Sequence, residues 1–319
     1  MTSIGVVGAG AFGTALAVAW GRAGRTVVLW GRDAAAMAAA RDGRGFARLP
    51  GVDRPDGVHP TSRTADLADC DVVVVAVPTQ TLADVLAGLP PLRPRMAVAA
   101  CKGIDMRRLR GPTDLLAEAW PQVPAGILSG PGFAAEIAAG RPTALALAAA
   151  DAARLADVQT ALSTPVLRLY RSGDVRGVEL GGALKNPIAI ACGVSAGLDL
   201  GESARAALMT RGMAEMTRLA TALGARPATL SGLSGLGDLA LTCGSPQSRN
   251  FALGRALGAG AAPARATTEG VSTAAAALDL AARHDVAMPV TAAVHALVGG
   301  AIRAEDAMDA LLARDLTEE

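Results

Sequence analysis

Residues that commonly bind metals or form disulfide frameworks are scarce in this sequence of 319 residues. Neither its four cysteines nor its three histidines show the close, regular spacing that is typical of a zinc site. These residues are Cys70, Cys101, Cys192, Cys243, His59, His284 and His295. We therefore predict no metal site and no disulfide framework, and four reduced thiols fit a cytoplasmic protein.

A strong net charge and long apolar segments are also lacking. The formal net charge is +1, which gives no electrostatic basis for binding nucleic acid or an anionic membrane. The longest apolar runs, such as residues 144–150, are far shorter than the roughly 20 residues that a membrane-spanning helix needs. A strand is expected almost directly after Met1, so we expect no signal peptide. The prediction is a cytoplasmic protein with no nucleic-acid partner and no membrane span.

The first half of the chain alternates between strand-like and helix-like segments. Strands are expected at Ile4–Val7, Thr26–Trp30, Asp71–Pro78, Met96–Cys101, Ala125–Ser129 and Thr143–Ala148, and helices after the first strand to about Arg22, at Ala34–Arg41 and at Thr81–Gly88. The third of these strands is apolar without alternation, which indicates burial on both faces in a parallel sheet. Such alternation predicts an α/β fold with a Rossmann-like, doubly wound sheet.

The second half has helical periodicity and no strand-like runs. Helices are expected at Gly177–Gly193, Ala204–Leu223, Gln247–Leu257, Thr273–His284 and Val290–Val298. We predict a dinucleotide-binding domain at residues 1–172 and an all-α domain at residues 173–319 that binds substrate and carries the catalytic groups. The apolar helices could pack within one chain or across a homodimer, and the sequence leaves both arrangements open.

A glycine-rich turn follows the first predicted strand and opens the first helix. Gly8 permits a tight turn, Gly10 lets a pyrophosphate approach the backbone, and Gly13 lets the helix pack closely on the sheet. The helix N-terminus offers free N–H groups to phosphates. A glycine-rich turn without a ligand is the alternative, but this position in a strand–turn–helix unit favours dinucleotide binding.

The choice of dinucleotide is expected at the end of the second strand, where an acidic residue would bind the ribose of NAD. Arg32 stands there and could pair with the 2′-phosphate of NADP, because a guanidinium matches a phosphate with two hydrogen bonds. Asp33 follows it and leaves NAD open. We favour NADP over NAD; an exposed charge at the end of a strand is the alternative role of Arg32.

Two lysines are candidates for chemistry. Lys102 follows a buried strand at the carboxyl edge of the predicted sheet, where ligands bind, although a solvated loop lysine fits equally well. Lys185 lies in an apolar segment, where burial disfavours the charged form and makes it a candidate proton donor. Its neighbour Asn186 could bond a substrate hydroxyl. Asp238, an acid in a glycine-rich stretch, could balance the charge of Lys185, or it could be a helix N-cap.

The segment Ser248-Arg249-Asn250 offers a hydroxyl, a guanidinium and an amide in succession. These groups together suit a phosphate monoester, since each can donate a hydrogen bond to a phosphate oxygen. We therefore predict that the substrate carries a phosphate.

Motifs along nearly the whole chain resemble those of bacterial-type NAD(P)-dependent glycerol-3-phosphate dehydrogenases. They are GVVGAGAFGTALA (5–17), CKG (101–103), ILSGPGFAAEIAAGRPTA (127–144), VELGGALKNPIAIACG (178–193), MTRGMAEM (209–216), GLSGLGDLALTC (232–243), QSRN (247–250) and TTEG (267–270). The resemblance implies reversible reduction of dihydroxyacetone phosphate to sn-glycerol 3-phosphate with NADP or NAD, a reaction that supplies phospholipid synthesis.

The resemblance also implies roles for individual residues. Lys185 matches the family's proton donor and acceptor, and Lys102 matches a lysine that reaches both substrate and cofactor. Asp238 and Thr242 match residues of the substrate site, and Arg249 and Asn250 match the pair that binds the substrate phosphate, with Arg249 also facing the nicotinamide nucleotide. Contacts with cofactor or substrate are implied for Ala11, Phe12, Arg32, Gly130, Ala134 and Glu269.

Three positions depart from the family pattern. Gly132 stands where a serine or threonine is more common, Pro187 where a branched apolar residue is more common, and Glu202 where an asparagine is usual. Pro187 would remove one backbone hydrogen bond within a helix. These departures affect the expected substrate geometry and leave every named catalytic group in place.

Two other functions fit parts of the sequence. A 3-hydroxyacid or ketopantoate reductase also pairs a dinucleotide domain with a helical domain that carries a lysine and an asparagine. A carboxylate substrate, however, does not require the second cationic anchor in Gln247–Asn250. A non-catalytic nicotinamide sensor would keep the glycine turn but has no need of Lys185 and Asp238.

Overall fold

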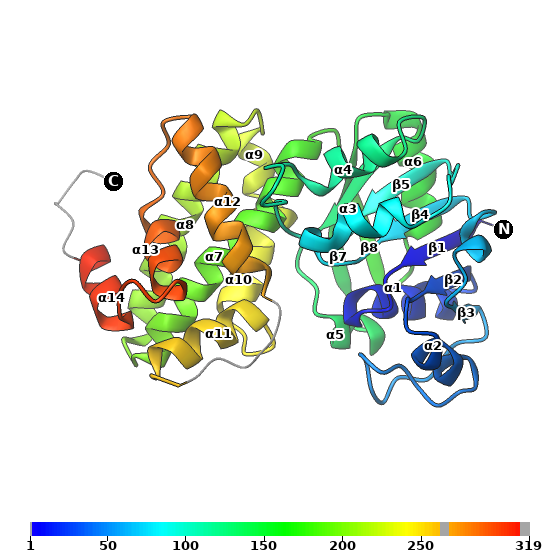
Figure 1. Cartoon of the computed structure of the whole chain (residues 1–319), viewed down its shortest axis with the longest axis horizontal. Coiled ribbons are helices and arrows are strands. Elements are labelled where there is room, and N and C mark those ends of the chain that lie inside the picture. Colours follow the sequence, from blue (N-terminus) through cyan, green and yellow to red (C-terminus); the bar gives the residue numbers. More distant parts are fainter. Residues whose placement is uncertain (1, 262–267, 313–319) are drawn as a thin grey trace. The chain divides into compact units, whose positions relative to one another are not determined.

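The structure is a computed structural model that describes residues 2–261 and 268–312. The chain consists of two compact units (Figure 1). The sheet unit comprises Met1–Lys102 and Arg110–Glu179, and the helical unit comprises Gly103–Leu109 and Leu180–Glu319. The domain boundary between residues 172 and 173 stays a prediction.

The sheet unit contains an eight-stranded sheet in the order β3-β2-β1-β4-β5-β6-β7-β8. The strands are β1 (Ser3–Val7), β2 (Thr26–Trp30), β3 (Val58–Thr61), β4 (Val72–Val75), β5 (Met96–Ala99), β6 (Ala125–Ser129), β7 (Thr143–Ala149) and β8 (Leu167–Ser172). Only the pairing of β6 with β7 is antiparallel. The order reverses at β1, because the chain runs outwards through β2 and β3 and then returns to β4. This confirms the predicted Rossmann-like sheet.

Two edge strands, β3 and β8, are absent from the prediction. The sequence of β3, Val58-His59-Pro60-Thr61, contains a proline, which strands tolerate mainly at an edge. In β8, the other edge strand, buried Leu167 and Leu169 alternate with exposed residues that point to the opposite face. The strand expected at Asp71–Pro78 is shorter than predicted and ends at Val75.

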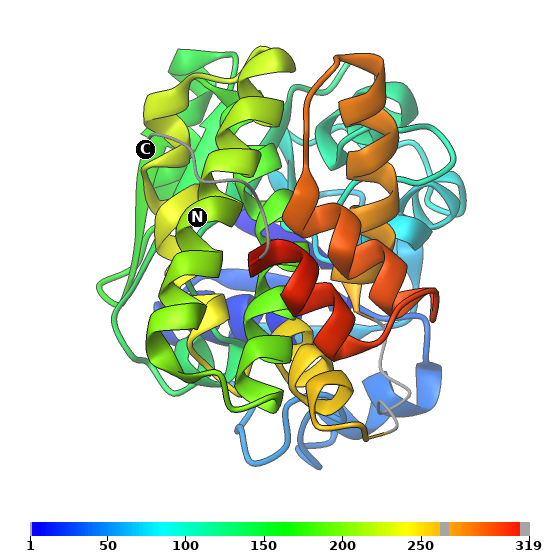
Figure 2. The same cartoon turned by 90° about the vertical axis from the view of Figure 1, so that its left-hand side faces the viewer.

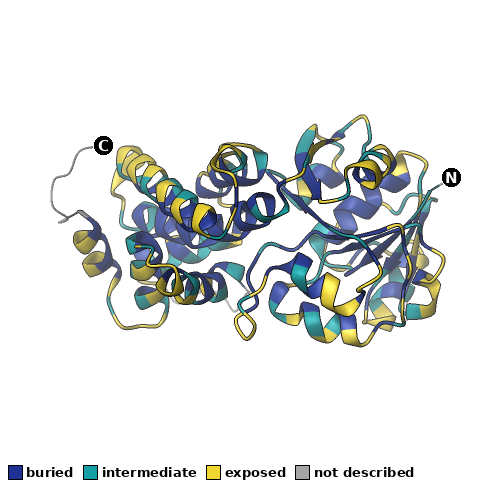
Figure 3. Ribbon diagram, turned by 90° about the horizontal axis from the view of Figure 1, so that it is seen from above, coloured by how far each residue is buried: buried dark blue, intermediate teal, exposed yellow. Residues whose placement is uncertain are grey.

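Helices cover both faces of the sheet. One face packs against α1 (Ala11–Arg22), α5 (Ala134–Ala138) and α6 (Ala152–Leu162), and α3 (Thr79–Ala87) and α4 (Pro112–Ala119) lie together beyond the other. The remaining elements are α2 (Ala34–Arg41) and the 3₁₀ turn η1 (Thr64–Leu67). All four residues of β4 are buried, as its unbroken apolar sequence predicts. Figure 3 shows the strands of the sheet as mostly buried, with many of the exposed residues on the surrounding helices and loops.

The helical unit is built around α7 (Val175–Gly197), whose residues 180–195 are all buried. The other elements are α8 (Gly201–Ala222), α9 (Pro227–Leu230), η2 (Leu233–Gly237), α10 (Asp238–Cys243), α11 (Arg249–Gly258), α12 (Glu269–Arg283), α13 (Pro289–Val298) and α14 (Ala304–Leu312). Helices α12, α13 and α14 follow one another side by side (Figure 2). Among the residues that the structure describes, no helix has the length and hydropathy required to cross a membrane.

Helices α7 and α11 approach each other through glycines on both sides. A Cβ at Gly193 would lie 2.2 Å from the carbonyl oxygen of Phe251, and a Cβ at Gly254 would lie 2.0 Å from that of Ile190. The next glycine pair along the contact, Gly197 and Gly258, is equally close. Only glycine permits this backbone approach, which holds the N-terminus of α11 near the middle of α7.

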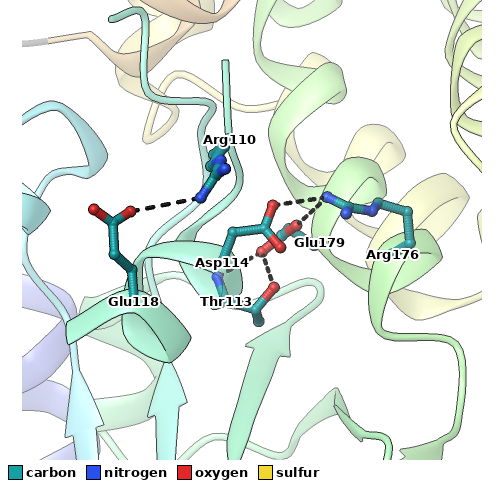
Figure 4. Close-up of polar contacts among 6 residues, drawn as sticks. All are labelled: Arg110, Thr113, Asp114, Glu118, Arg176 and Glu179. Carbon is teal, nitrogen blue, oxygen red and sulfur yellow. Dashed lines mark hydrogen bonds and ion pairs between the residues drawn. The ribbon is translucent and has the colours of Figure 1, made fainter. Parts of the chain in front are cut away.

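Two helices that begin with proline are capped by buried glutamates from other helices. Glu179 accepts hydrogen bonds from the Thr113 N–H at 2.8 Å and the Thr113 hydroxyl at 2.7 Å, and it lies 3.4 Å from Arg176 (Figure 4). Gly111, the N-cap of α4, has no side chain to provide this cap, and a Cβ there would clash with Glu179. A carboxylate in this position satisfies donors that a helix leaves unpaired at its N-terminus.

Glu215 caps α13 in the same way. Its carboxylate accepts from the Val290 N–H at 2.5 Å, the Thr291 N–H at 3.2 Å and the Thr291 hydroxyl at 3.1 Å. Desolvation by burial raises the pKa of Glu215 above its ordinary value, against the opposing effect of these hydrogen bonds.

We expect Glu215→Gln to lower the free energy of unfolding by about 1–3 kcal/mol, because an amide NH₂ cannot accept from these buried donors. The raised pKa means that the folded protein keeps the proton to higher pH than the unfolded chain does. The contribution of this titration to stability is therefore full below the ordinary glutamate pKa and declines as pH rises through the raised value. Urea unfolding between pH 4 and 8 measures the free energy of unfolding of the wild type and of Glu215→Gln. The difference between the two free energies should become smaller as the pH rises. A difference that widens would contradict the raised pKa.

Candidate functional site

The glycine turn between β1 and α1 has the geometry of a phosphate cradle. Gly8 has φ +116°, and a Cβ there would lie 2.8 Å from the carbonyl oxygen of Ala76. A Cβ at Gly13 would lie 2.2 Å from the carbonyl oxygen of Gly8, so the turn and the helix both require glycine. By contrast, a Cβ at Gly10 would meet nothing within 4 Å. The backbone at Gly10, the N-cap of α1, is therefore open on the side that a side chain would occupy, as the approach of a pyrophosphate to Gly10, Ala11 and Phe12 would require.

Arg32 and Asp33 follow β2, and their side chains differ in hydrogen bonding. Arg32 is exposed. The Asp33 carboxylate is the N-cap of α2, where it accepts from the Ala36 N–H at 3.0 Å. Asp33 therefore has a structural role in the helix that follows the strand.

Lys102 contacts two other predicted cofactor or substrate residues of the sheet unit. Its Nζ donates to the Gly130 carbonyl oxygen at 2.8 Å and lies 6.0 Å from the centre of the Phe12 ring. Gly130 follows β6 with φ +142°, a conformation that side chains disfavour. Ala134 begins α5 four residues later. The structure thus joins the glycine turn, the end of β5 and the end of β6 at the carboxyl edge of the sheet.

In the helical unit, Lys185 forms a buried triad with Asp238 and Thr242. Lys185 Nζ lies 3.1 Å from Asp238 Oδ1 and 2.5 Å from the Thr242 hydroxyl, which is itself 3.3 Å from Asp238 Oδ1. The Lys185 and Asp238 side chains are 8% and 2% exposed. Asp238 is the first residue of α10, and its carboxylate is directed to Lys185. The Lys185 ammonium is therefore paired with a carboxylate and a hydroxyl inside the helical unit.

The local backbone explains how Asp238 reaches Lys185. The preceding segment η2 is a π-helical turn in which a Cβ at Gly235 would lie 1.9 Å from the carbonyl oxygen of Leu230. On α7, a Cβ at Gly181 would lie 2.9 Å from the carbonyl oxygen of Ser234. These glycines let α10 start close to α7, one turn before Lys185. Segments of π-helix are frequent at functional sites.

The thiol of Cys243, next to Thr242 in the sequence, is not an anionic partner of Lys185. A hydrogen bond with Cys192 and burial both raise the pKa of Cys243 well above the ordinary value for a thiol. The Cys243 side chain is consequently neutral near neutral pH. Asp238 is the acidic side chain that faces Lys185 Nζ, at 3.1 Å.

The predicted phosphate-binding residues lie at the start of α11. The Ser248 hydroxyl caps this helix by accepting from the Phe251 N–H at 3.2 Å, and Arg249 is exposed in the first turn. Asn250 contacts Asn186 and the backbone of Gly270, one residue after Glu269 at the start of α12. The contact with Gly270 is absent from the prediction. Thr267 of the TTEG motif lies outside the described residues.

The predicted site residues thus form one group in each unit. Gly8, Gly10, Ala11, Phe12, Gly13, Arg32, Lys102, Gly130 and Ala134 belong to the sheet unit, and Lys185, Asn186, Asp238, Thr242, Ser248, Arg249, Asn250 and Glu269 belong to the helical unit. The sequence contains no lysine besides Lys102 and Lys185 among its 30 lysines and arginines. Lysine can shed a proton when buried and arginine cannot, so this scarcity is a further signal for both positions.

The structure shows the surroundings of the three positions that depart from the family pattern. A Cβ at Gly132 would lie 3.1 Å from Ile137 Cδ1 and 3.2 Å from Thr143 Cγ2, so a larger residue would need its neighbours to move. Helix α7 runs through Pro187 without interruption. Glu202 is exposed in the first turn of α8 and is paired with Arg205.

Comparisons with known proteins agree over both units. Residues 3–155 match the family described as NAD-dependent glycerol-3-phosphate dehydrogenase N-terminus, and residues 174–309 match the family described as its C-terminus. The glycerol-3-phosphate dehydrogenase [NAD(P)+] of Cereibacter sphaeroides is 55% identical over 99% of this chain and 100% of its own length. The enzyme of the same name from Roseobacter denitrificans is 52% identical over the same shares.

A solved structure is similar throughout. The crystal structure of glycerol-3-phosphate dehydrogenase from Coxiella burnetii matches with a TM-score of 0.93 and 35% sequence identity, covering 98% of this chain and 99% of that chain. Its fold therefore agrees with that of this chain over nearly the whole length.

Proposed function

The chain belongs to the NAD-dependent glycerol-3-phosphate dehydrogenase family, and on this premise we propose that Lys185 transfers the proton in the reaction. The protein is an oxidoreductase with glycerol-3-phosphate dehydrogenase [NAD(P)+] activity. The proposal depends on one observation above all, which is the buried contact of Lys185 with Asp238 and Thr242.

The glycine turn would hold NAD(P)H, which would supply the hydride that reduces the C2 carbonyl of dihydroxyacetone phosphate. As negative charge develops on the carbonyl oxygen, Lys185 donates a proton from Nζ to it and becomes a neutral amine. Asp238 holds the ammonium in place and balances its charge, and Thr242 fixes its direction through the 2.5 Å hydrogen bond. In the reverse direction, the neutral amine accepts the proton of the C2 hydroxyl.

We propose that the phosphate of the substrate binds Arg249, with Asn250 and Ser248 beside it, and that Lys102 also contacts the substrate, as the family resemblance implies. Holding the remote phosphate fixes the reacting carbon, and such positioning contributes several kcal/mol to catalysis. We also propose that Gly130, Ala134 and Glu269 line the cofactor or substrate, and that the product supplies phospholipid synthesis in the cytoplasm, as the family resemblance implies.

Within NAD(P), we propose a preference for NADP. Arg32 is exposed after β2, where the 2′-phosphate would lie, and Asp33 is engaged as the N-cap of α2. The negatively charged 2′-phosphate of NADP attracts a guanidinium and repels a carboxylate.

We expect Arg32→Ala to raise the KM for NADPH about 10-fold and to change the KM for NADH less than about 2-fold. The reason is that an exposed charge-assisted hydrogen bond contributes about 1.5 kcal/mol or more. Initial rates with each dinucleotide measure the two constants. Equal changes in both would show that Arg32 does not read the 2′-phosphate.

The function is tested by the loss of nicotinamide absorbance when dihydroxyacetone phosphate is added to the protein with NADH or NADPH. We expect oxidation of the nicotinamide with this substrate and none with ketopantoate, which has a carboxylate instead of a phosphate. Reduction of ketopantoate at a similar kcat/KM would favour the alternative reductase.

A further inference from the structure

The sequence contains only two asparagines, Asn186 and Asn250, and they are hydrogen-bonded to each other. Asn250 Nδ2 donates to Asn186 Oδ1 at 2.9 Å. Asn250 Oδ1 accepts from the backbone N–H of Gly270 at 3.0 Å. The pair therefore connects α7, α11 and the first turn of α12 within the helical unit.

The Gly270 N–H determines the orientation of both side-chain amides. A backbone N–H can only donate, so the atom of Asn250 that faces it must be the oxygen. The NH₂ group of Asn250 must then face Asn186, which accepts through Oδ1. Asn186 is thereby restricted to donating, through Nδ2, in any hydrogen bond that it makes at its other end.

The surrounding backbone is shaped for this pair. A Cβ at Gly270 would lie 2.6 Å from Asn250 Oδ1 and 3.0 Å from the carbonyl oxygen of Asn186, so a side chain there would displace the amide. The glycine contact between α7 and α11 holds Asn250 beside Asn186. Asn186 is 4% exposed and directly follows Lys185 in the chain.

We propose that Asn250 is a positioning residue that fixes Asn186 as a hydrogen-bond donor to an oxygen of the substrate. This inference rests on the proposed function, because the reacting oxygen is placed beside Lys185. The reaction then depends on the direction of the hydrogen bond between the two asparagines. Asn250 contributes to the reaction through Asn186, in addition to any contact with the phosphate.

The variant Asn250→Asp tests the proposal with a minimal change of shape. The aspartate keeps the acceptor for Gly270 but presents a second oxygen to Asn186, which must rotate and donate to it. The donor is thereby withdrawn from the substrate, and we expect kcat/KM for dihydroxyacetone phosphate to fall about 30-fold. In an Asn186→Ala background, the same change should cost several-fold less than in the wild type, because only the direct effect of Asn250 on the phosphate remains.

Equal losses in the two backgrounds would overturn the proposal, since Asn250 would then act independently, for example by charge on the phosphate. Asn250→Ala adds no charge and should show the same dependence on Asn186. A wild-type protein that does not reduce dihydroxyacetone phosphate would overturn the proposed function itself. An active wild type in which the loss of kcat/KM is the same with and without Asn186 would overturn this inference alone.

A measurement without turnover uses protein labelled with ¹⁵N-asparagine, which has two side-chain NH₂ groups. Asn186→Asp and Asn250→Asp each leave one group and so assign the spectrum. We expect sn-glycerol 3-phosphate to shift the Asn186 NH₂ signals in the wild type and not in Asn250→Asp. The same shift in both proteins would overturn the proposal.

Discussion

Replacing Lys185 with alanine is expected to lower kcat for dihydroxyacetone phosphate reduction by about 10³–10⁴-fold. General acid–base groups typically contribute 10²–10⁴-fold, and here the loss falls at the upper end because Asp238 is left as an unpaired charge in a buried site. Steady-state rates at saturating NADPH and substrate measure the effect. Circular dichroism and thermal unfolding check that the variant is folded.

The variant Lys185→Arg separates charge from proton transfer. Arginine keeps the positive charge and the hydrogen-bond donors but does not release a proton near neutral pH. We expect it to be nearly as slow as Lys185→Ala. A folded arginine variant with wild-type kcat would show that position 185 supplies charge alone.

Replacing Arg249 with alanine is expected to raise the KM for dihydroxyacetone phosphate about 100-fold, equivalent to roughly 3 kcal/mol. The reason is the loss of a guanidinium that makes charge-assisted hydrogen bonds to phosphate. The effect on kcat should be smaller, provided that the substrate is saturating. Initial rates over a range of substrate concentrations measure both constants.

Arg255 provides a matched control, because it is exposed and lies on the same helix as Arg249. Arg255→Ala removes the same charge six residues further along α11, and we expect it to leave KM unchanged. If the two variants had the same KM, the phosphate would have to bind elsewhere.

Much of the sheet unit could be predicted because its central strands are apolar throughout. The residues of β4 are buried on both faces of the sheet, and their unbroken apolar sequence indicates this directly. The edge strands β3 and β8 have one neighbour each, and their mixed sequences resemble loops. The short elements η2 and α10 were also missed, because glycine contacts with distant segments stabilise them and local periodicity does not reveal those contacts.

The site residues could be selected from the sequence, but their partners could not. Burial of Lys185 predicts that it needs a counter-charge, and Asp238 is a candidate because it is an acid in a glycine-rich stretch. The hydrogen bond of Thr242 to Lys185 and that of Asn250 to Gly270 depend on how α10, α11 and α12 pack on α7, which periodicity does not specify. The catalytic roles of these residues stay predictions.

Rescue of Lys185→Ala by added amines tests the central claim most directly. The account predicts that ethylammonium restores dihydroxyacetone phosphate reduction in a saturable manner, because it can occupy the vacated space and donate a proton. Tetramethylammonium has the same charge and no proton to donate, and it should restore nothing. Equal rescue by both ions, or wild-type turnover by the folded variant without either, would contradict proton transfer from Lys185.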